Sequence, residues 1–359
     1  MGYIRLLHPS NPQTLYPHHI AERLQFIMPF SLSTLSLNRD TLGLDRFPLY
    51  GVFVKWKLSD AIYVLIIYAL DWVYFEKIPP FQRQFTINDI TLSHPFAEHE
   101  RVPGDVLLNL ITFVPAILMA LVSALLTPRP FKIYVIYLSI LGVFISMGTC
   151  IFVTDVLKNW TGRCRPDFLA RCQPKEGLLP DVLYNAVDAC TTKDFAKLQD
   201  GFRTTPSGHS SMSWSAFGYV SLWLNGQLNC SHVHRGAWRS IIAFLPCLVA
   251  FYVALSRTQD YRHHFIDIIL GSLLGGFIAW WSYRRYFPSL HSKGCYIPYV
   301  LLGKINQENG EFESESEQMG HDYYKDVQLA MGTYLPTATR SEDGITNNLD
   351  LENPNGYSF

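Results

Sequence analysis

The chain alternates between long apolar runs and shorter polar segments. Six stretches approach the roughly 20 apolar residues with which a helix crosses a bilayer; they are residues 58–75, 106–126, 133–153, 210–224, 241–255 and 265–283. The first carries Asp71 near its end, which needs a wet or paired site. The fourth is short and rich in serine, so hydropathy alone would not identify it. The pattern predicts an all-α membrane protein with six transmembrane helices.

Basic pairs recur on one side of these stretches and indicate their orientation. The pairs are Lys55 and Lys57, Arg129 and Lys132, Arg235 and Arg239, and Arg284 and Arg285. Six crossings place all of them on one face, which the positive-inside rule makes cytosolic together with both termini. Segments 76–105, 154–209 and 256–264 then lie on the extracytoplasmic face, lumenal or extracellular. The sequence does not choose among vacuole, endoplasmic reticulum, Golgi and plasma membrane.

Composition supports this division of the chain. Of the 359 residues 48% are hydrophobic and 16% are charged. In a soluble domain about a quarter of the residues are usually charged. The net charge of -1 indicates no basic field for nucleic acid. No apolar run typical of a cleaved signal peptide occurs near the start. We expect a cytosolic extension over 1–50, a transmembrane domain over 51–290, and an acidic tail over 291–359 with the composition of disordered chain.

Three polar clusters fall on the predicted extracytoplasmic face. In the segment after 255, His263 and Asp267 are four residues apart, so on a helix they would share a face and the carboxylate would hold one imidazole nitrogen. After the third stretch come Lys158 and Arg165, cations able to hold an oxyanion. At the start of the fourth, the sequence Pro-Ser-Gly-His ends at His209 and predicts backbone N–H donors at a helix N-terminus.

Each cluster also has a simpler interpretation. The first would be a helix-capping group outside the bilayer, the second a belt of snorkelling basic side chains, and the third an N-cap turn with a surface histidine. Together, however, the clusters supply cations, neutral donors, two histidines and a carboxylate on one membrane face. That inventory suits a phosphate, its nucleophile and the proton donor for its leaving group.

The pattern K-x6-RP, then PSGH, then SR-x5-H-x3-D resembles the phosphatidic acid phosphatase type 2 superfamily, which includes the lipid phosphate phosphatases. Its eleven fixed positions are all met, by Lys158, Arg165, Pro166, Pro206, Ser207, Gly208, His209, Ser256, Arg257, His263 and Asp267. Residues 81–103 resemble the first lumenal loop of lipid phosphate phosphatases. Residues 190–193, 200–211 and 254–265 are similar to fungal diacylglycerol pyrophosphate phosphatases. The resemblance covers about residues 50–290.

The resemblance implies a catalytic role for three residues. His263 is the nucleophile and forms a phosphohistidine, Asp267 orients it, and His209 protonates the leaving lipid oxygen and later activates water. The phosphoryl oxygens are held by Lys158, Arg165, Arg257, Ser207 and the backbone of Gly208. His264 is a rival for the nucleophile, but the motif spacing favours His263.

The implied reaction is hydrolysis of diacylglycerol pyrophosphate to phosphatidate and of phosphatidate to diacylglycerol, with a phospholipid of the bilayer as substrate. Neither metal nor cofactor is implied, because cationic side chains replace Mg²⁺, and activity should survive EDTA. The sequence holds no DxDx[TV] motif, no Cys-x5-Arg loop and no P-loop. A phosphatase for sphingoid-base or isoprenoid phosphates shares the same motifs, and a non-catalytic lipid-binding relative is the rival outside the enzymes. We expect substrate choice to lie in residues 76–105 and 167–205; the oligomeric state is left open.

Two further patterns bear on packing. Cys172 and Cys190 fall in the large extracytoplasmic segment, where oxidation is permitted, so we hypothesise a disulfide between them. Gly271 and Gly275 are four residues apart in the last apolar stretch, a spacing that favours close helix packing.

Overall fold

The computed structural model describes residues 48–231, 235–292 and 294–302. The predicted N-terminal extension up to residue 47 and the acidic tail from residue 303 lie outside the described residues. The chain divides into two units, one ending at Trp56 and one beginning at Lys57. In the first unit the described part contains the short helix α2 (Tyr50–Lys55), with Lys55 in its last turn.

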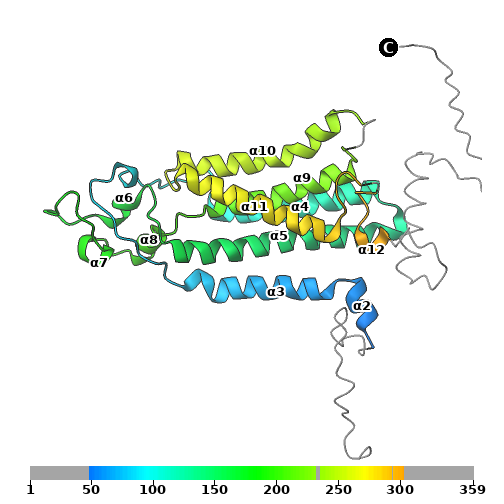
Figure 1. Cartoon of the computed structure of the whole chain (residues 1–359), viewed down its shortest axis with the longest axis horizontal. Helices are drawn as coiled ribbons and strands as arrows, with labels where there is room; N and C mark the ends of the chain where they lie inside the picture. Colours follow the sequence, from blue (N-terminus) through cyan, green and yellow to red (C-terminus); the bar gives the residue numbers. More distant parts are fainter. Residues whose placement is uncertain (1–47, 232–234, 293, 303–359) are drawn as a thin grey trace, which may run out of the picture. The chain divides into compact units, whose positions relative to one another are not determined.

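Six long helices form the bundle in the described part of the second unit (Figure 1). They are α3 (Leu58–Val73), α4 (Gly104–Leu126), α5 (Lys132–Thr161), α9 (Gly208–Gln227), α10 (Trp238–Gln259) and α11 (Phe265–Tyr286). Each overlaps one of the six predicted stretches, and the described residues form no β-strand. Four segments are long and apolar enough to cross a membrane: Gly104–Leu126, Arg129–Thr161, Trp238–Gln259 and Phe265–Tyr286. Helix α3, with 16 residues, is shorter, and α9 is more polar.

Helix α9 owes its polarity to its position inside the bundle. It contacts α4, α5, α10 and α11, so most of its residues are buried against protein. The small hydroxyls of Ser211, Ser213 and Ser215 turn back to donate to carbonyls of the preceding turn, at 2.9–3.2 Å. A helix shielded from lipid in this way needs no apolar surface, and this explains the weak hydropathy signal of the fourth stretch.

The predicted glycine face of α11 lies against the start of α9. A Cβ on Gly271 would come within 2.6 Å of the carbonyl oxygen of Ser207, and one on Gly275 would overlap the carbonyl of Ser211. The two backbones therefore approach more closely than any larger residue would allow, as expected for this spacing. The contact fixes the first turn of α9 relative to α11.

The polar segments at one end of the helices form a layer of their own, here called the loop layer (residues 76–103 and 162–206). Its short elements are η3 (Phe75–Lys77), η4 (Ile90–Leu92), α6 (Phe168–Cys172), α7 (Ala186–Ala189) and α8 (Phe195–Asp200). Figure 1 shows α6, α7 and α8 together at one end of the long helices. Phe85, Phe168 and Phe202 are buried at the centre of this layer and pack ring against ring.

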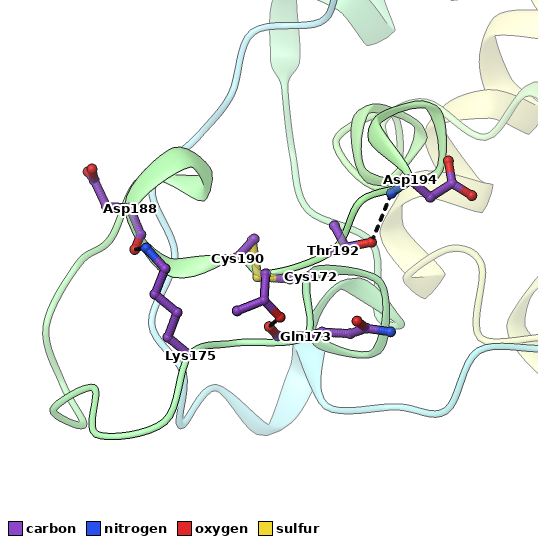
Figure 2. The surroundings of a disulfide bond; sticks show 8 residues. Cys172, Gln173, Lys175, Asp188, Cys190, Thr192 and Asp194 are labelled. Atoms are coloured by element: carbon purple, nitrogen blue, oxygen red, sulfur yellow. Dashed lines mark hydrogen bonds between the residues drawn. A yellow bond between two sulfur atoms is a disulfide. The ribbon is translucent and has the colours of Figure 1, made fainter.

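A disulfide joins Cys172 to Cys190, as hypothesised from the sequence (Figure 2). It ties α6 to the chain that leaves α7, and the hydroxyl of Thr191 donates to the carbonyl of Gln173 at 2.6 Å beside it. Cys164 stays a free thiol, buried in the same apolar cluster. The bridge closes the segment from Cys172 to Cys190. Arg165 and Asp200, two charged residues of the candidate site, lie on either side of that segment in the chain.

At the other end of the bundle, the turn η5 (Arg129–Phe131) precedes α5, and the chain after α11 folds back. Cys295, Ile297 and Leu301 are buried, and the amide of Gln227 donates to the carbonyl of Tyr296 at 3.0 Å. The short helix α12 (Tyr299–Leu302) follows. Residues after 290 therefore pack against the end of α9.

Candidate active site

The first cluster is shaped by the end of α5. Lys158 lies in its last turn, and Gly162 ends the helix in the left-handed region at φ 57°. A Cβ on Gly162 would overlap the carbonyl of Phe81, so only glycine fits this turn. The chain then reverses, and the backbone N–H of Arg165 donates to the carbonyl of Gly201 at 2.8 Å. Lys158 is thus held by the last turn of α5, and Arg165 by the loop layer just after the chain reverses.

The second cluster meets the first at the N-terminus of α9. Ser207 is the N-cap, and its hydroxyl accepts from the backbone N–H of Ser210 at 3.5 Å. The ammonium of Lys158 lies 2.8 Å from where a Cβ of Gly208 would stand. The backbone N–H of Ser207 donates to the carbonyl of Asp267 at 3.0 Å. Residues of all three sequence clusters therefore meet at this helix N-terminus, a place that favours anions.

His263 is buried beside this point, with its Nδ1 2.7 Å from the backbone carbonyl of Thr204. A carbonyl only accepts, so in the neutral imidazole Nδ1 carries the proton and Nε2 has the free lone pair. Burial, together with the guanidinium of Arg165, lowers the pKa of His263 well below the usual histidine value. The ring is therefore held as a neutral base with Nε2 available.

The expected pairing of Asp267 with His263 is wrong in this structure. Helix α11 begins at Phe265 with His264 as its N-cap, so His263 precedes the helix and the four-residue spacing no longer puts it on the face of Asp267. Among the described residues the carboxylate instead accepts from the backbone N–H of His264 at 2.9 Å, and from two hydroxyls, those of Thr204 at 2.8 Å and Thr205 at 2.5 Å. The Asp267 side chain is fully buried.

Asp267 also accepts from Arg163 at 3.2 Å, and its Oδ2 lies 3.3 Å from Nδ1 of His264. Its link to His263 runs through Thr204, whose hydroxyl lies 3.3 Å from Nδ1 of His263 and donates to Asp267. The carboxylate therefore positions the 204–205 backbone and the start of α11, and through them the imidazole.

His209 lies in the first turn of α9, with Nε2 3.0 Å from the carbonyl of Val102. By the same argument the neutral ring carries its proton on Nε2 and directs it at that carbonyl. This contact attaches the segment before α4 to the site.

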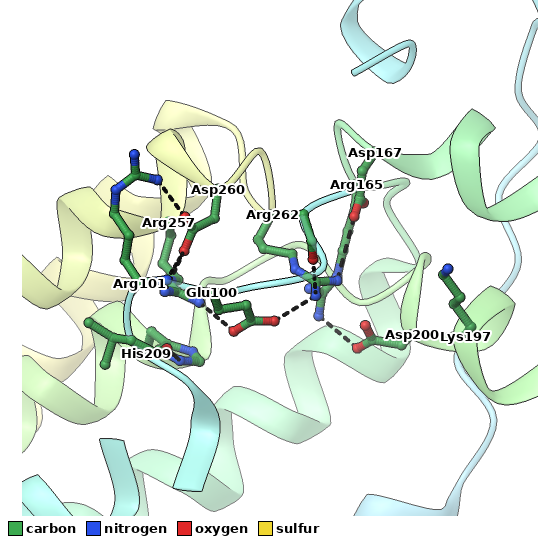
Figure 3. A network of polar contacts seen from close by, with 12 residues as sticks. Glu100, Arg101, Arg165, Asp167, Lys197, Asp200, His209, Arg257, Asp260 and Arg262 are labelled. Atoms are coloured by element: carbon green, nitrogen blue, oxygen red, sulfur yellow. Dashed lines mark hydrogen bonds and ion pairs between the residues drawn. The ribbon is translucent and has the colours of Figure 1, made fainter. Parts of the chain in front are cut away.

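The two arginines of the motif are held by carboxylates. Arg165 donates to Asp200 at 2.7 Å, and Arg257 donates to Glu100 and Asp260 at 2.8 Å each (Figure 3). Burial alone would raise the pKa of the Asp200 carboxyl, but the guanidiniums of Arg165 and Arg171 outweigh it and lower that pKa. Both arginines are fixed in place as cations.

Several of these contacts were missed by the sequence argument. Thr204, Thr205 and Arg163 lie inside the stretches quoted for the resemblance, so their position was a signal, but nothing in the spacing marked them out. Glu100 and Asp260 also lie inside quoted stretches, residues 81–103 and 254–265, but nothing in the sequence marked them as partners of Arg257. Within the described residues, no three His, Cys, Asp or Glu side chains are grouped so as to hold a metal ion.

Comparison with known proteins identifies the family of the chain. The PAP2 superfamily profile matches residues 139–291. Diacylglycerol pyrophosphate phosphatase 1 of Saccharomyces cerevisiae is 48% identical over 242 residues, covering 67% of this chain and 83% of the yeast protein. The probable diacylglycerol pyrophosphate phosphatase 1 of Schizosaccharomyces pombe is 38% identical over 253 residues, covering 70% and 89%.

More distant relatives extend the same set. Lipid phosphate phosphatase 2 of Arabidopsis thaliana is 29% identical over 297 residues, covering 80% of this chain and 97% of the plant protein. No solved structure matches the chain. With its apolar helices, its cluster of motif residues and these relatives, the chain is an integral membrane protein that belongs to the PAP2 superfamily, among the lipid phosphate phosphatases.

Proposed function

We propose that the protein is a metal-independent lipid phosphatase. It removes the terminal phosphate of diacylglycerol pyrophosphate to give phosphatidate, and hydrolyses phosphatidate to diacylglycerol. The observation that carries the proposal is the meeting of Lys158, the N-terminus of α9 and the neutral His263 in one site. The relatives named for these lipids support the choice of substrate.

The first step is attack by Nε2 of His263 on phosphorus. The bond from phosphorus to the leaving oxygen breaks as the bond from Nε2 to phosphorus forms, giving a phosphohistidine. The Thr204 carbonyl stabilises the positive charge that develops on the ring, because it accepts from Nδ1–H throughout. Asp267 acts behind it by holding Thr204 and Thr205.

His209 handles the protons. It gives a proton to the departing lipid oxygen, then takes one from the water that attacks phosphorus and releases phosphate. Because Nε2–H of His209 is directed at the carbonyl of Val102, the acid form is the imidazolium, which carries a second proton on Nδ1 and gives that proton to the leaving oxygen. The lone pair of Nδ1 then serves as the base for water.

The phosphoryl oxygens are held by cations and helix donors. Lys158 and Arg165 approach from α5 and the loop layer, Arg257 from the end of α10, and the N–H groups beside Ser207 and Gly208 from α9. Charge developing on the oxygens in the transition state is met by donors already in place. These cations take the part that Mg²⁺ plays in other phosphatases.

We further propose that all six long helices cross the membrane, with the site on the extracytoplasmic side. The basic pairs lie at the ends of helices α4, α5, α10 and α11 that are opposite to the site, as the positive-inside rule requires of a cytosolic face. Helix α9 crosses inside the bundle and α3 crosses as a short helix. The N-terminal extension and the acidic tail are then cytosolic.

The decisive experiment measures phosphate release from detergent micelles in EDTA. Wild type is tested against diacylglycerol pyrophosphate, phosphatidate, a sphingoid-base phosphate, an isoprenoid diphosphate and a soluble sugar phosphate. We expect EDTA-resistant release from the first two, with the highest kcat/KM for one of them. A higher kcat/KM for another lipid would replace the proposed substrate. Loss of activity on chelation would contradict the proposed metal-independent mechanism. A well-folded wild type inactive on all of them would favour the non-catalytic relative.

The nucleophile is assigned by a matched pair of neighbouring variants. His263→Ala should lose activity by roughly 10³-fold or more, because the covalent route is gone. His264→Ala keeps its backbone N–H bond to Asp267 and should retain activity within about tenfold, the cost of a lost second contact. An inactive His264→Ala beside an active His263→Ala would reverse the assignment.

A further inference from the structure

A continuous series of ion pairs runs across the site end of the molecule (Figure 3). Cations and carboxylates alternate along it in the order Arg101, Asp260, Arg257, Glu100, Arg262, Asp167, Arg171, Asp200 and Arg165. Two of its members, Arg257 and Arg165, are proposed phosphate ligands. Within this series each of them already has a carboxylate where an anionic substrate would bind.

The two carboxylates on Arg257 differ in how firmly they are held. Asp260 is 1% exposed, ends the same helix, and also accepts from the backbone and side chain of Arg101 at 3.0 and 2.7 Å. Glu100 is 24% exposed and lies on the irregular segment before α4, where it accepts from Arg257 at 2.8 Å and from Arg262 at 2.6 Å. Asp260 is therefore a fixed partner, and Glu100 is the partner able to move.

The surroundings of Glu100 give it somewhere to go. A hollow of about 320 Å³ opens beside it, lined by Glu98, His99, Glu100, Pro103 and Gly104. Val102, two residues further on, accepts from His209, so this segment adjoins the proposed general acid. A rotation of the Glu100 side chain into the hollow would free one edge of the Arg257 guanidinium beside the catalytic histidine.

We infer that Glu100 is an internal counter-ion that the substrate phosphate displaces from Arg257, so that it sets how tightly the site holds phosphate anions. Carboxylate and phosphate compete for the same planar fork of donors. The inference rests on the proposed role of Arg257. Its consequence is weaker binding of every phosphate anion, the released inorganic phosphate included, which keeps the site from being filled by its own product.

The test uses purified full-length protein in detergent and inorganic phosphate as the probe. Its inhibition constant against lipid phosphate hydrolysis is measured for wild type and Glu100→Gln. We expect the constant to fall about tenfold, with KM falling in parallel, since one charge-assisted competitor has been removed. An unchanged inhibition constant would overturn the inference. A larger constant would also overturn it, because Glu100 would then serve to position Arg257 for phosphate binding.

Glu98→Gln is the matched control. It removes the same charge two residues away, from an exposed side chain that lines the same hollow, and should leave the constant unchanged. An equal fall of the inhibition constant in both variants would mean that loss of one negative charge near the site is enough to tighten phosphate binding. The displacement of Glu100 would then be refuted. If Glu100→Gln does not fold, Glu100→Asp keeps the charge but withdraws the carboxylate, and should lower the constant by a smaller factor.

The inference and the proposed function fail differently. A folded wild type that hydrolyses no lipid phosphate would overturn both. An active wild type, abolished by His263→Ala but inhibited by phosphate to the same extent with and without Glu100, would overturn the inference alone.

Discussion

A buried carboxylate contacts each end of α11, Asp267 in its first turn and Asp60 of α3 at its last turn, and the two ends differ in how the charged groups are paired. At the far end Asp60 of α3 accepts from Arg285 at 3.0 and 2.5 Å and from the hydroxyl of Tyr286 at 2.6 Å. The carboxylate there is matched by one guanidinium and two hydroxyls, since the hydroxyl of Ser59 also donates to it at 3.4 Å. The pair is complete and attaches α3 to α11.

At the site end the carboxylates leave some donors of the proposed phosphate ligands unused. Lys158 has one acidic partner, Asp155 at 3.2 Å, and both are partly exposed. Among the described residues, the buried Nε of Arg165 has no hydrogen-bond partner. A completed pair marks a structural attachment, whereas donors left over beside a neutral imidazole mark a place for an anion. The predictions below test that distinction.

The largest effect is expected when one cation is removed at each end. Lys158→Ala should lower kcat by about 10²–10³, the usual loss for one oxyanion donor, while its partly exposed ion pair contributes about 1 kcal/mol or less to stability. Arg285→Ala should leave kcat per folded molecule unchanged. Phosphate release and thermal unfolding of both variants are the measurements. A catalytic loss with Arg285→Ala equal to that with Lys158→Ala would erase the distinction.

The next effect concerns the loop layer that supports the site end. Replacing Cys172 and Cys190 together by serine opens a closure of 18 residues and should cost about 3 kcal/mol in the chain-entropy description. The thermal midpoint is compared with that of Cys230→Ala, which removes a free thiol outside this layer. If reductant lowers the midpoint of the double variant as much as that of wild type, the bridge is not the source of the stability.

A smaller effect is expected at the far end. Asp60→Asn leaves Arg285 and Tyr286 without their anionic acceptor and should destabilise the fold by about 1–3 kcal/mol. Activity measured per folded molecule should stay within the error of wild type. A changed KM for lipid with an unaltered thermal midpoint would show that this end also takes part in substrate binding.

The smallest effect is on pH dependence. Burial and Arg165 lower the pKa of His263, so the reactive neutral ring persists as the pH falls through 6.5. The acid limb of kcat/KM, which reports the free enzyme, should therefore lie below pH 6.5. Arg165→Gln removes one lowering charge and should move that limb upward. A wild-type limb centred at 6.5 that Arg165→Gln does not move would show that His263 titrates as an ordinary histidine.

The sequence located the helices and the motif residues because both depend on local pattern. Apolar runs predicted five of the six long helices, and α9 needed its motif because burial among four helices removes the requirement for an apolar surface. Lys158 lies beside Gly208, and the backbone N–H of Ser207 donates to the carbonyl of Asp267.

The contacts between these residues could not be predicted from the sequence pattern, because they depend on the tertiary fold. The spacing of His263 and Asp267 was interpreted as helical. The N-cap of α11 is His264, however, so His263 lies just before the helix and does not share a helix face with Asp267. Glu100 lies 157 residues from Arg257 in the chain, so only the folded loop layer joins them. The Cys172–Cys190 bridge was chosen correctly, but the burial of Cys164 as a third thiol is a matter of tertiary packing.

The length of α5 bears on the depth at which the proposed chemistry would take place. Its 30 residues rise about 45 Å at 1.5 Å each, while the hydrocarbon core is about 30 Å thick and the bilayer with its headgroups about 40–45 Å. A helix of that length is long enough to reach from one headgroup layer to the other, and with the proposed orientation Lys158 in its last turn would lie at the level of the lipid phosphates. A lipid would then meet the cations without leaving its leaflet, whereas a phosphate on a short water-soluble molecule would have no anchor at that depth.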